Sequence, residues 1–312
     1  MKQEDRYIYQ VYCEGSFSKA AQKLYVTQPT LSLAIQRVEQ QLQMPLFDRS
    51  SRPLALTDAG RAYIDTLEQE VQLRQDLHRQ LEDIRNRNTG CVRLGGSHYI
   101  NAYILPELLS SFQAQYPGIQ IELCENDSVT LAQMLTDKQV DLTFSCNTNF
   151  IGDFNNFPAF YDHILLAVPR HWDLSDDLRH LALTAADIIA GKHLSEACPS
   201  VDLQSFREYP FILLKEGNNL HERCHSMFQD AGFSPLIKME LSQLVTAYRM
   251  AQHNIGITFV SDRLVESSDQ SLCFFKLDHS LANRHFFLLM PKNMYISHAT
   301  RTFVDHVRNN MN

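Results

Sequence analysis

The chain has 312 residues, 44% of them hydrophobic and 21% charged, which is enough for two or three domains with buried cores. This composition excludes a largely disordered chain, and the longest apolar runs are far shorter than a membrane helix requires. Residues 1–6 contain no apolar run, so we expect no secretory signal there. Seven scattered cysteines without a C-x-x-C pair predict reduced thiols and a cytoplasmic location.

The net charge of −8 is distributed unevenly, which restricts where nucleic acid can bind. Residues 1–64 carry eight Lys and Arg against six Asp and Glu, whereas residues 89–312 carry 16 against 24. Because phosphates attract cations and repel carboxylates, any DNA contact must come from the first segment.

The pattern at the start of the chain predicts two short helices. Residues 4–13 form the first, which Gly15 ends, and Ser18 is expected to cap the second. One face of the second helix carries apolar and small side chains, which allow another helix to approach closely. These are Phe17, Ala20, Ala21 and Leu24.

A third helix is predicted after a tight connection at residues 26–29. Thr27 or Gln28 can cap it, and Pro29 is tolerated in a first helical turn. The helix is expected to end near residue 42. Its apolar stripe consists of Leu31, Ile35, Val38 and Leu42.

A small hairpin and a long helix are expected next. The apolar segments 46–47 and 54–56 flank a basic turn at 49–53. Thr57 is expected to cap a helix over residues 58–88, which contains no proline. A long helix with a narrow apolar stripe requires a partner helix, so we predict dimerisation through this stripe. Its members are Leu67, Val71, Leu77, Leu81 and Ile84.

Beyond Gly90 the pattern becomes one of strands alternating with helices, which predicts an α/β domain. Strands are expected at 91–94, 119–123 and 141–145. The helix–strand–helix–strand order over 112–144 is repeated over 228–259, which indicates two lobes with a cleft between them. The chain is expected to cross between the lobes at 162–169 and to return over 263–276. No element is assigned to the polar segment 170–207.

The segment 16–60 has the pattern of a helix-turn-helix followed by a hairpin. The third helix can enter a major groove with its first turn facing base edges and its apolar stripe facing inward. Uncharged donors and acceptors on its outward side are Gln28, Thr30, Ser32 and Gln36. Side chains that can bind phosphates or a minor groove are Arg37, Arg49 and Arg52. A generic three-helix cluster with incidental arginines is the alternative.

These residues resemble the N-terminal domain of LysR-type transcriptional regulators. The pattern S-F-x-x-A-A-x-x-L-x-V-x-Q-P-x-x-S, followed by R-x-E, P-L-F-x-R and L-T-x-A-G, is matched almost throughout residues 16–60. The long helix and the two-lobed remainder fit the same family, so the resemblance covers the whole chain. It implies a winged helix-turn-helix, a long linker helix and a two-lobed, periplasmic-binding-protein-like α/β effector domain.

The resemblance sets the domain boundaries that we expect. Residues 1–60 are the DNA-binding domain, 61–89 the linker and dimerisation helix, and 90–312 the effector domain. Within the effector domain, lobe I is expected over about 90–163 and 265–312. Lobe II is expected over about 164–264.

The resemblance also implies which residues contact DNA. Positions expected at the groove are Ser18, Thr27, Gln28, Pro29, Thr30, Ser32, Leu33 and Gln36. Positions expected to flank it are Arg37, Arg49 and Arg52. Members commonly carry a long polar side chain and a Gln where this chain has Leu33 and Ala34. These apolar side chains suit a thymine methyl group but not a guanine edge.

Two helix starts in the α/β domain are candidate effector contacts. Gly95–His98 follows a strand and opens a helix, where free N–H groups and the helix dipole favour a carboxylate or another anion. Gly217–Asn219 is expected to open a helix in the second lobe, and Asn147 follows the third strand. Ordinary capping is the alternative at both helix starts. The expected effector contacts are Gly96, Ser97, His98, Asn147, Asn218 and Asn219.

A rival motif is H-E-x-x-H at residues 221–225. Two His on one helical face bind zinc in that signature, and the Glu acts as general base. The alternative function is therefore a metal-responsive regulator or a zinc metalloenzyme that uses His221, Glu222 and His225. No third ligand is evident in the sequence. Cys198 is a candidate redox sensor, but an ordinary thiol is favoured because no basic cluster lies near it.

The sequence as a whole predicts a transcriptional regulator rather than an enzyme, with no catalytic residue, metal or cofactor assigned. The expected partners are a double-stranded, pseudo-palindromic operator and a small-molecule effector. Half-sites are expected about one helical turn apart. The resemblance implies a homodimer, usually assembled to a tetramer. RNA polymerase is a further expected partner, and a membrane is not.

Overall fold

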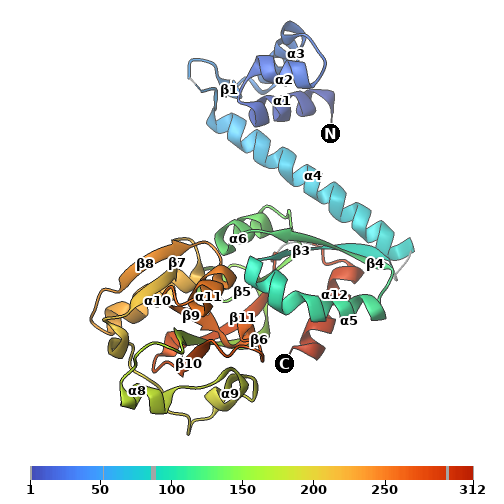
Figure 1. Cartoon of the computed structure of the whole chain (residues 1–312). Helices are drawn as coiled ribbons and strands as arrows, with labels where there is room; N and C mark the ends of the chain where they lie inside the picture. The colour runs from blue at the N-terminus through green and yellow to red at the C-terminus, as the bar shows by residue number, and fades with distance from the viewer. Residues whose placement is uncertain (1, 52, 86–88, 293–294, 312) are drawn as a thin grey trace. The chain divides into compact units, whose positions relative to one another are not determined.

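The computed structural model describes residues 2–51, 53–85, 89–292 and 295–311, which belong to two compact units (Figure 1). Unit 1 comprises Met1–Arg85 and unit 2 comprises Asn86–Asn312. Within the described ranges, no helix combines the length and the apolar character that a bilayer span requires.

Unit 1 consists of short helices, a small hairpin and one long helix. The elements are α1 (Gln3–Glu14), α2 (Phe17–Lys23), α3 (Gln28–Leu42), β1 (Phe47–Asp48), β2 (Ala55–Leu56) and α4 (Asp58–Arg85). The two strands pair antiparallel, so the predicted hairpin is confirmed. The core joins the apolar faces of the helices and includes Ile8, Val11, Ala20, Ala21, Leu31, Ile35 and Leu46.

The helix ends of unit 1 follow the capping pattern of the sequence, with one correction. Gly15 ends α1 with a left-handed φ of 56°. Thr27 caps α3 and accepts the N–H of Thr30 at 3.3 Å. The cap of α2 is Ser16 and not Ser18, because Ser16 precedes the first helical residue and accepts the N–H of Lys19.

The predicted apolar stripe of α3 is confirmed in its first three members and wrong in the last. Leu31, Ile35 and Val38 are buried, whereas Leu42 is 43% exposed. Leu42 lies in the last turn of α3, next to the exposed turn 43–45, where no neighbouring helix covers it.

Unit 2 is an α/β domain in which one long strand, β6 (Asn155–Pro169), runs through both lobes. Its first part pairs with β11 (Asn283–Met290), and its second part pairs with β9 (Ile257–Ser261) and β10 (Leu272–Lys276). The strand order is β4-β3-β5-β11-β6-β9-β7-β8, with β10 on β6. The predicted crossing between the lobes is therefore confirmed.

The remaining elements divide between the lobes on either side of β6. Lobe I holds β3 (Gly90–Gly96), α5 (Leu105–Gln115), β4 (Ile119–Glu125), α6 (Ser128–Thr136), β5 (Leu142–Ser145), α7 (Thr148–Ile151) and α12 (His298–Asn310). Lobe II holds α8 (Asp176–Leu181), α9 (Ala185–Ile189), β7 (Pro210–Leu214), α10 (Asn219–Asp230), β8 (Leu236–Leu241) and α11 (Leu244–Gln252). The predicted repeat is confirmed, since α5-β4-α6-β5 and α10-β8-α11-β9 follow the same order.

The predicted return from lobe II lies too early in the sequence. β10 pairs with Leu165–Pro169, which belongs to lobe II, and its side chains Leu272, Phe274 and Phe275 fill the lobe II core. The chain reaches lobe I only at β11. Residues 265–276 therefore belong to lobe II, because their burial depends on that core. The unassigned segment 170–207 forms α8, α9 and short turns, with bridges to residues 274 and 277.

Gly60 joins α4 to the hairpin by a close backbone approach. A Cβ atom built on Gly60 would lie 1.9 Å from the carbonyl oxygen of Leu46. The Thr57 side chain fixes the same corner, because its hydroxyl donates to the Pro45 carbonyl at 2.6 Å and accepts the Gly60 N–H at 2.9 Å. These contacts explain why the L-T-x-A-G segment has a threonine at position 57 and a glycine at position 60.

We expect Gly60→Ala to lower the free energy of unfolding by about 1–3 kcal/mol or more, because the backbone must shift to admit the methyl group. Urea unfolding of the full chain, followed by circular dichroism, measures this. Gly152→Ala is the matched control, since no atom lies within 4 Å of its Cβ position. Equal unfolding midpoints for the two variants would contradict this explanation.

Candidate functional site

The first turns of α3 present polar side chains to solvent, while the apolar stripe faces the core of unit 1. The exposed residues of this surface are Thr27, Gln28, Pro29, Thr30, Leu33, Gln36 and Arg37. Ser32 is half-buried. A helix that its own unit holds on one side and leaves open on the other is the arrangement needed for insertion into a groove.

Two hydrogen bonds fix the side chains at the start of α3. The Ser18 hydroxyl donates to Oε1 of Gln28 at 3.0 Å and thereby ties α2 to α3. The hydroxyl oxygens of Thr27 and Thr30 are 2.8 Å apart. Because Ser18 occupies the carbonyl oxygen of the Gln28 amide, the NH2 group of Gln28 is the part left to donate to a base edge or a phosphate.

Leu33 is the large apolar side chain of this surface and is 55% exposed. The helical period places it on the outward side, between Pro29 and Gln36. Ala34, by contrast, packs against the core of unit 1. Of these two apolar positions, Leu33 is therefore the one that is free to contact a base.

Arg49 on the hairpin is held by two neighbours. Its guanidinium lies 3.2 Å from the Glu39 carboxylate and 5.1 Å from the centre of the Phe17 ring. Glu39 also accepts the N–H of Leu46 at 2.8 Å. The R-x-E and P-L-F-x-R segments thus form a clamp between α3 and the hairpin. The Arg49 side chain remains 48% exposed, so it can still reach a phosphate.

Arg52, an expected phosphate contact in the hairpin, lies outside the described residues. Tyr25, which the sequence pattern did not single out, is 97% exposed and adopts a left-handed φ of 57° in the turn before α3. The presence of an aromatic residue in so short a turn is the sequence signal that could have identified Tyr25 as an exposed surface residue.

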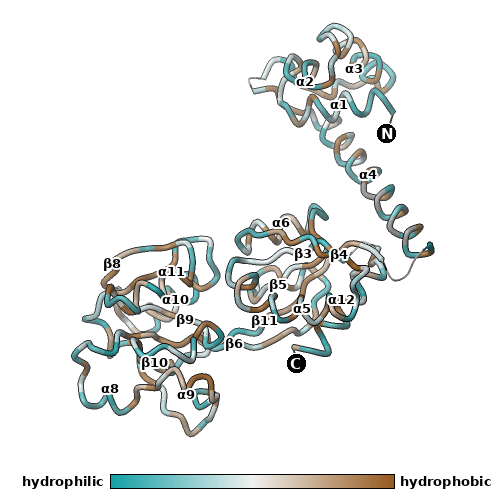
Figure 2. The backbone as a smooth tube through the Cα atoms, turned by 45° about the vertical axis from the view of Figure 1, so that its right-hand side comes forward, coloured by the Kyte–Doolittle hydropathy of each residue, from teal (hydrophilic) through white to brown (hydrophobic). Residues whose placement is uncertain are grey.

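The long helix α4 has an exposed apolar face that differs from the predicted seam. Leu77, Leu81 and Ile84 are exposed as predicted, and Leu73 shares their face at the spacing i, i+4, i+8 and i+11. Figure 2 shows hydrophobic and hydrophilic stretches alternating along this helix. Leu67 is buried in the core of unit 1, so its assignment to the dimer seam is wrong.

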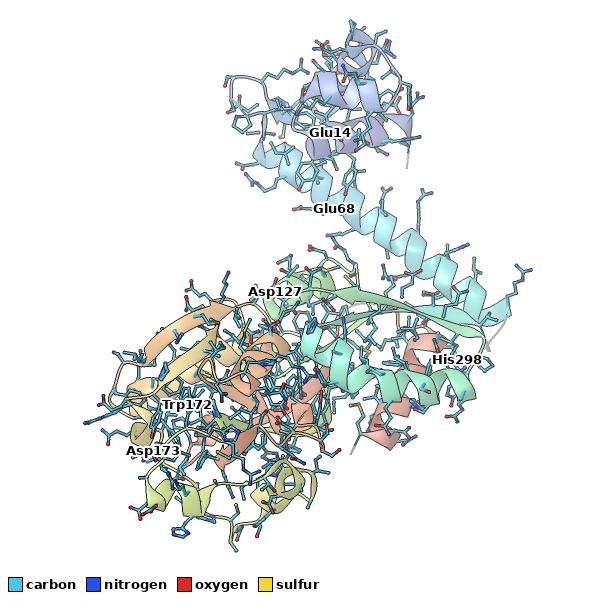
Figure 3. The ribbon with its side chains drawn as sticks, in the orientation of Figure 1. Glu14, Glu68, Asp127, Trp172, Asp173 and His298 are labelled. Atoms are coloured by element: carbon cyan, nitrogen blue, oxygen red, sulfur yellow. The ribbon has the colours of Figure 1, made fainter. Side chains whose placement is uncertain are left out.

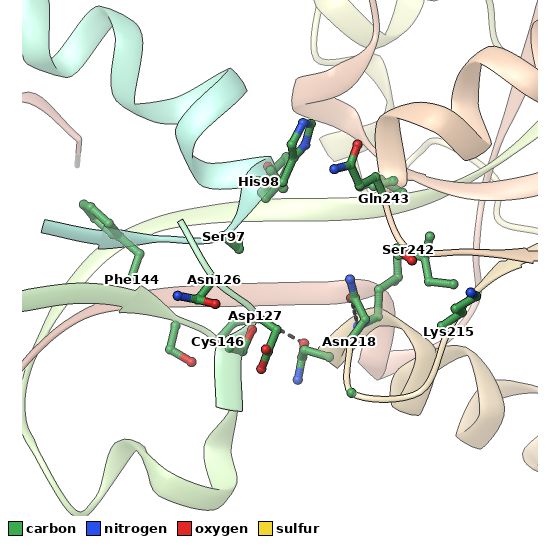
Figure 4. Close-up of a pocket in the computed structure, with 18 of the residues that line it drawn as sticks. Ser97, His98, Asn126, Asp127, Phe144, Cys146, Lys215, Asn218, Ser242 and Gln243 are labelled. Atoms are coloured by element: carbon green, nitrogen blue, oxygen red, sulfur yellow. Dashed lines mark hydrogen bonds between the residues drawn. The ribbon is translucent and has the colours of Figure 1, made fainter. Parts of the chain in front are cut away.

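A cleft of about 410 Å³ lies between the two lobes of unit 2 (Figure 4). The starts of several helices converge on it: the helical segment after β3, and α6, α10 and α11. Lining residues from these starts are Ser97, His98, Asp127, Ser128, Asn218, Asn219, Gln243 and Leu244. Helix starts carry N–H groups without helical partners and the positive end of the helix dipole.

The expected effector contacts divide into two groups. Ser97, His98, Asn218 and Asn219 line the cleft. Gly96 and Asn147 do not belong to the lining. Gly96 is buried at the end of β3, with its carbonyl oxygen bound to the Asn101 side chain, and Asn147 caps α7. Both therefore have structural roles, and their assignment as effector contacts stays a prediction.

The helix starts at the cleft differ in how their N–H groups are satisfied. Asp127 accepts the N–H groups of Val129 and Thr130 at 3.0 and 2.9 Å, and Figure 3 shows it at the start of α6. Asn218 accepts the N–H of Leu220 at 3.0 Å. Gln243, the cap of α11, makes no such bond. The first turn of α11 therefore keeps N–H groups that a ligand can use.

The floor of the cleft contains a buried ion pair. Nε of Arg284 donates to Asp162 at 2.6 Å, and Nη2 of Arg284 binds the other carboxylate oxygen. Tyr99 donates to the same carboxylate at 2.8 Å, and Ser261 does so at 3.1 Å. Burial raises the pKa of Tyr99 well above its ordinary value, and the charge of Asp162 raises it further. Asp162 thus neutralises Arg284, which lines the cleft without offering a free charge.

The described residues around the H-E-x-x-H segment on α10 do not favour a zinc site. Nδ1 of His221 lies 2.6 Å from the carbonyl oxygen of Leu214, and its ring stacks on that of His225 with centroids 5.1 Å apart. Among the described residues, neither histidine belongs to a cluster of three metal-ligating side chains. The core face of α10 instead buries Leu220, Cys224 and Phe228. Cys198 is buried too, which agrees with an ordinary thiol.

Comparison with known proteins places both units in one family. Residues 4–61 match the model of the bacterial regulatory helix-turn-helix protein, lysR family, and residues 85–312 match the LysR substrate binding domain. An uncharacterized HTH-type transcriptional regulator, YcgK of Bacillus subtilis, is 28% identical over 300 residues, which cover 95% of this chain and 90% of that protein.

Two solved structures share the fold. CbnR in complex with its target DNA has a TM-score of 0.63 at 18% identity, covering 99% of each chain. The regulatory domain of Synechocystis CcmR in complex with 2-PG has a TM-score of 0.60 at 18% identity, covering 72% of this chain and 98% of that one. Since the two matched models together span almost the whole chain, it belongs to the LysR family of DNA-binding transcriptional regulators.

Proposed function

We propose that α3 is the recognition helix and that Thr27, Gln28, Pro29, Thr30, Leu33 and Gln36 face the bases of an operator. The observation that carries this proposal is the division of α3 into a buried apolar stripe and an exposed polar surface at its start. Arg37 and Arg49 lie where they can neutralise phosphates. Ser18 supports Gln28 through its hydrogen bond. Ser32, being half-buried, is a secondary contact.

The roles of the chain's parts follow from this surface. Residues 1–60 bind DNA, residues 61–89 link and dimerise, and residues 90–312 bind the effector. A two-fold dimer would place two recognition helices on half-sites about one helical turn apart. CbnR was solved with its target DNA, which supports this use of the fold. We place the protein in the cytoplasm. A DNA target and the seven free cysteines both support this location.

We assign dimerisation to the exposed apolar face of α4, formed by Leu73, Leu77, Leu81 and Ile84. Each of these side chains is more than half exposed. Because α4 is otherwise polar, its narrow apolar face is best buried by packing against the same face of a second helix.

We assign effector binding to the cleft of unit 2 and a carboxylate or another small anion to the effector. The free first turn of α11 and the Ser97, Asn218 and Lys215 side chains around the cleft supply donors for such a group. The acidic Asp127 is already occupied as a helix cap. The CcmR regulatory domain holds its ligand 2-PG on the same fold, which supports a small-molecule effector.

Replacing either polar contact of α3 should weaken operator binding. We expect Gln28→Ala and Arg37→Ala each to cost about 1–3 kcal/mol, because each removes one hydrogen-bonding side chain from the interface. Gel-shift titration with the DNA upstream of the gene measures this, and Arg37→Ala should also lower the salt dependence. Gln41→Ala, an exposed glutamine at the far end of α3, is the control. Unchanged affinity in both test variants would contradict this placement.

Charges on the exposed face of α4 should separate the protomers. We expect the double variant Leu77→Asp and Leu81→Asp to raise the dissociation constant of the dimer at least about tenfold, because two carboxylates would be buried at the seam. Sedimentation velocity over a concentration series measures it. Val71 was predicted in the seam and is 40% exposed, but the helical period places it on a neighbouring face of α4, so Val71→Asp is the control. If it dissociates the dimer equally, the seam is not the one assigned here.

An anionic effector should stabilise the chain by binding only its folded state. A ligand present at 100 times its Kd adds about 2.7 kcal/mol to the free energy of unfolding. We expect a thermal-shift screen of small carboxylates, phosphates and 2-PG to find such a ligand. Ser97→Ala should weaken the binding of this ligand about tenfold or more, because one hydrogen bond to its charged group is lost. Ser226→Ala, at a half-buried position of α10 outside the cleft lining, should leave the binding unchanged. A screen in which only neutral or cationic compounds bind would contradict the assignment.

A further inference from the structure

A second cluster of polar side chains lies in unit 2, outside the effector cleft. His163 is on β6, Asp262 directly follows β9, and His193 lies in the short turn Lys192–Leu194. Nδ1 of His163 and Nε2 of His193 lie 3.1 and 3.0 Å from the same oxygen, Oδ2 of Asp262. Over the described residues, this is the one group of three or more metal-ligating side chains whose ligand atoms all lie within 4.8 Å of one another.

The spacing of these atoms suits one metal ion. With metal–ligand bonds of about 2.0–2.1 Å, neighbouring ligand atoms are roughly 3.3 Å apart in a tetrahedral site and roughly 3.0 Å apart in an octahedral one. The two N···O distances are within a few tenths of an ångström of these values. The imidazole rings of His163 and His193 meet at 74° instead of stacking, so both rings can present a nitrogen to the carboxylate.

The charge of the cluster also suits a cation. Asp262 contributes a carboxylate whose other oxygen, Oδ1, accepts the backbone N–H of His163 at 3.1 Å. The cation beside it in the chain, Arg263, is engaged elsewhere. It donates twice to the Tyr161 carbonyl at 3.1 Å and lies over the Phe160 ring.

The internal hydrogen bonds leave the cluster incomplete. Nδ1 of the buried His193 has no hydrogen-bond partner among the described residues, which is uncommon for a finished structural network. The cluster also borders a cavity of about 680 Å³, lined by all three side chains together with Tyr161, Arg263 and His285. His163 is 30% exposed, so an ion and its water ligands can enter from this side.

We propose that His163, His193 and Asp262 bind one divalent transition-metal ion, with the remaining coordination positions open to water in the adjoining cavity. Two imidazoles and one carboxylate form a donor set that suits Zn²⁺, and Ca²⁺ or Mg²⁺ would prefer oxygen ligands. The ion would take the place of the protons that the two rings share with Asp262. It would join three segments that are far apart in the sequence.

The position of this site connects it to the effector cleft. Asp162 and Ser261, which belong to the buried network on the cleft floor, directly precede His163 and Asp262 in the chain. A bound ion would therefore hold β6 and the end of β9 together at the point where β6 passes between the lobes. Metal binding would stiffen the same backbone that positions the cleft.

The test uses the full chain, purified without a histidine tag and treated with EDTA, and Zn²⁺ alone as the probe. Titration against a chromophoric chelator should show one ion per chain. His163→Ala and Asp262→Asn should weaken binding at least about tenfold, since each removes a ligand. Absence of specific Zn²⁺ binding, or unchanged binding in both variants, would overturn the proposal.

Two controls separate this site from other histidines. His279→Ala removes a second histidine–carboxylate pair, with Nε2 of His279 2.9 Å from Asp230, and should leave Zn²⁺ binding unchanged. His225→Ala removes one histidine of the H-E-x-x-H segment and should also bind normally. If the ligand variants fail to fold, anomalous diffraction from wild-type crystals grown with Zn²⁺ decides. A peak between the three side chains supports the site, and a peak elsewhere or none refutes it.

Discussion

The buried ion pair between Arg284 and Asp162 is the interaction on which the arrangement of unit 2 depends. The two residues lie opposite each other on β11 and β6, at the point where β6 leaves lobe I. Burying both charges is costly, and their attraction offsets that cost only when the remaining lone pairs are also satisfied. Tyr99 of lobe I and Ser261 at the end of β9 provide these hydrogen bonds. The carboxylate is thus satisfied only when both lobes are in place.

This pair also determines what kind of recognition the cleft can perform. Arg284 is the buried cation of the lining, yet its charge is neutralised by Asp162. Binding of an anion must therefore rely on N–H groups at helix starts, on neutral donors such as Ser97, and on the ammonium group of Lys215 in the lining. The neutral donors are directional and weaker than a free guanidinium, so they favour a small ligand that reaches several of them at once.

The sequence predicted the helices and strands of this protein well, because the spacing of apolar residues indicates which face of an amphipathic helix or strand is buried. It was less informative about which distant segments meet. The apolar strand β10 had to be buried, but nothing in Leu272–Lys276 indicated which lobe would cover it. Gly96 and Ser97 show the same limit at the scale of one residue. Ser97 lines the cleft, whereas Gly96 is the last residue of a buried strand.

The two histidine clusters show why a spacing motif and a site are different things. His221 and His225 have the spacing of a zinc signature, yet one ring is held by a backbone carbonyl and, in the part of the chain that the structure describes, no third ligand joins them. The other cluster has no signature, because its members come from segments 69 and 99 residues apart. Only the folded chain brings them together, so periodicity and spacing cannot identify such a site.

The segments that carry the family resemblance mostly hold unit 1 together. Glu39 and Arg49 clamp the hairpin to α3, and Gly60 admits the carbonyl of Leu46 at the start of α4. These contacts fix the position of α3 but leave its outward side free. With α3 placed as proposed, base preference would come from its exposed side chains, including Gln28 and Leu33. The resemblance accordingly identifies the scaffold, and Leu33 is the exposed position at which this chain departs from the family pattern.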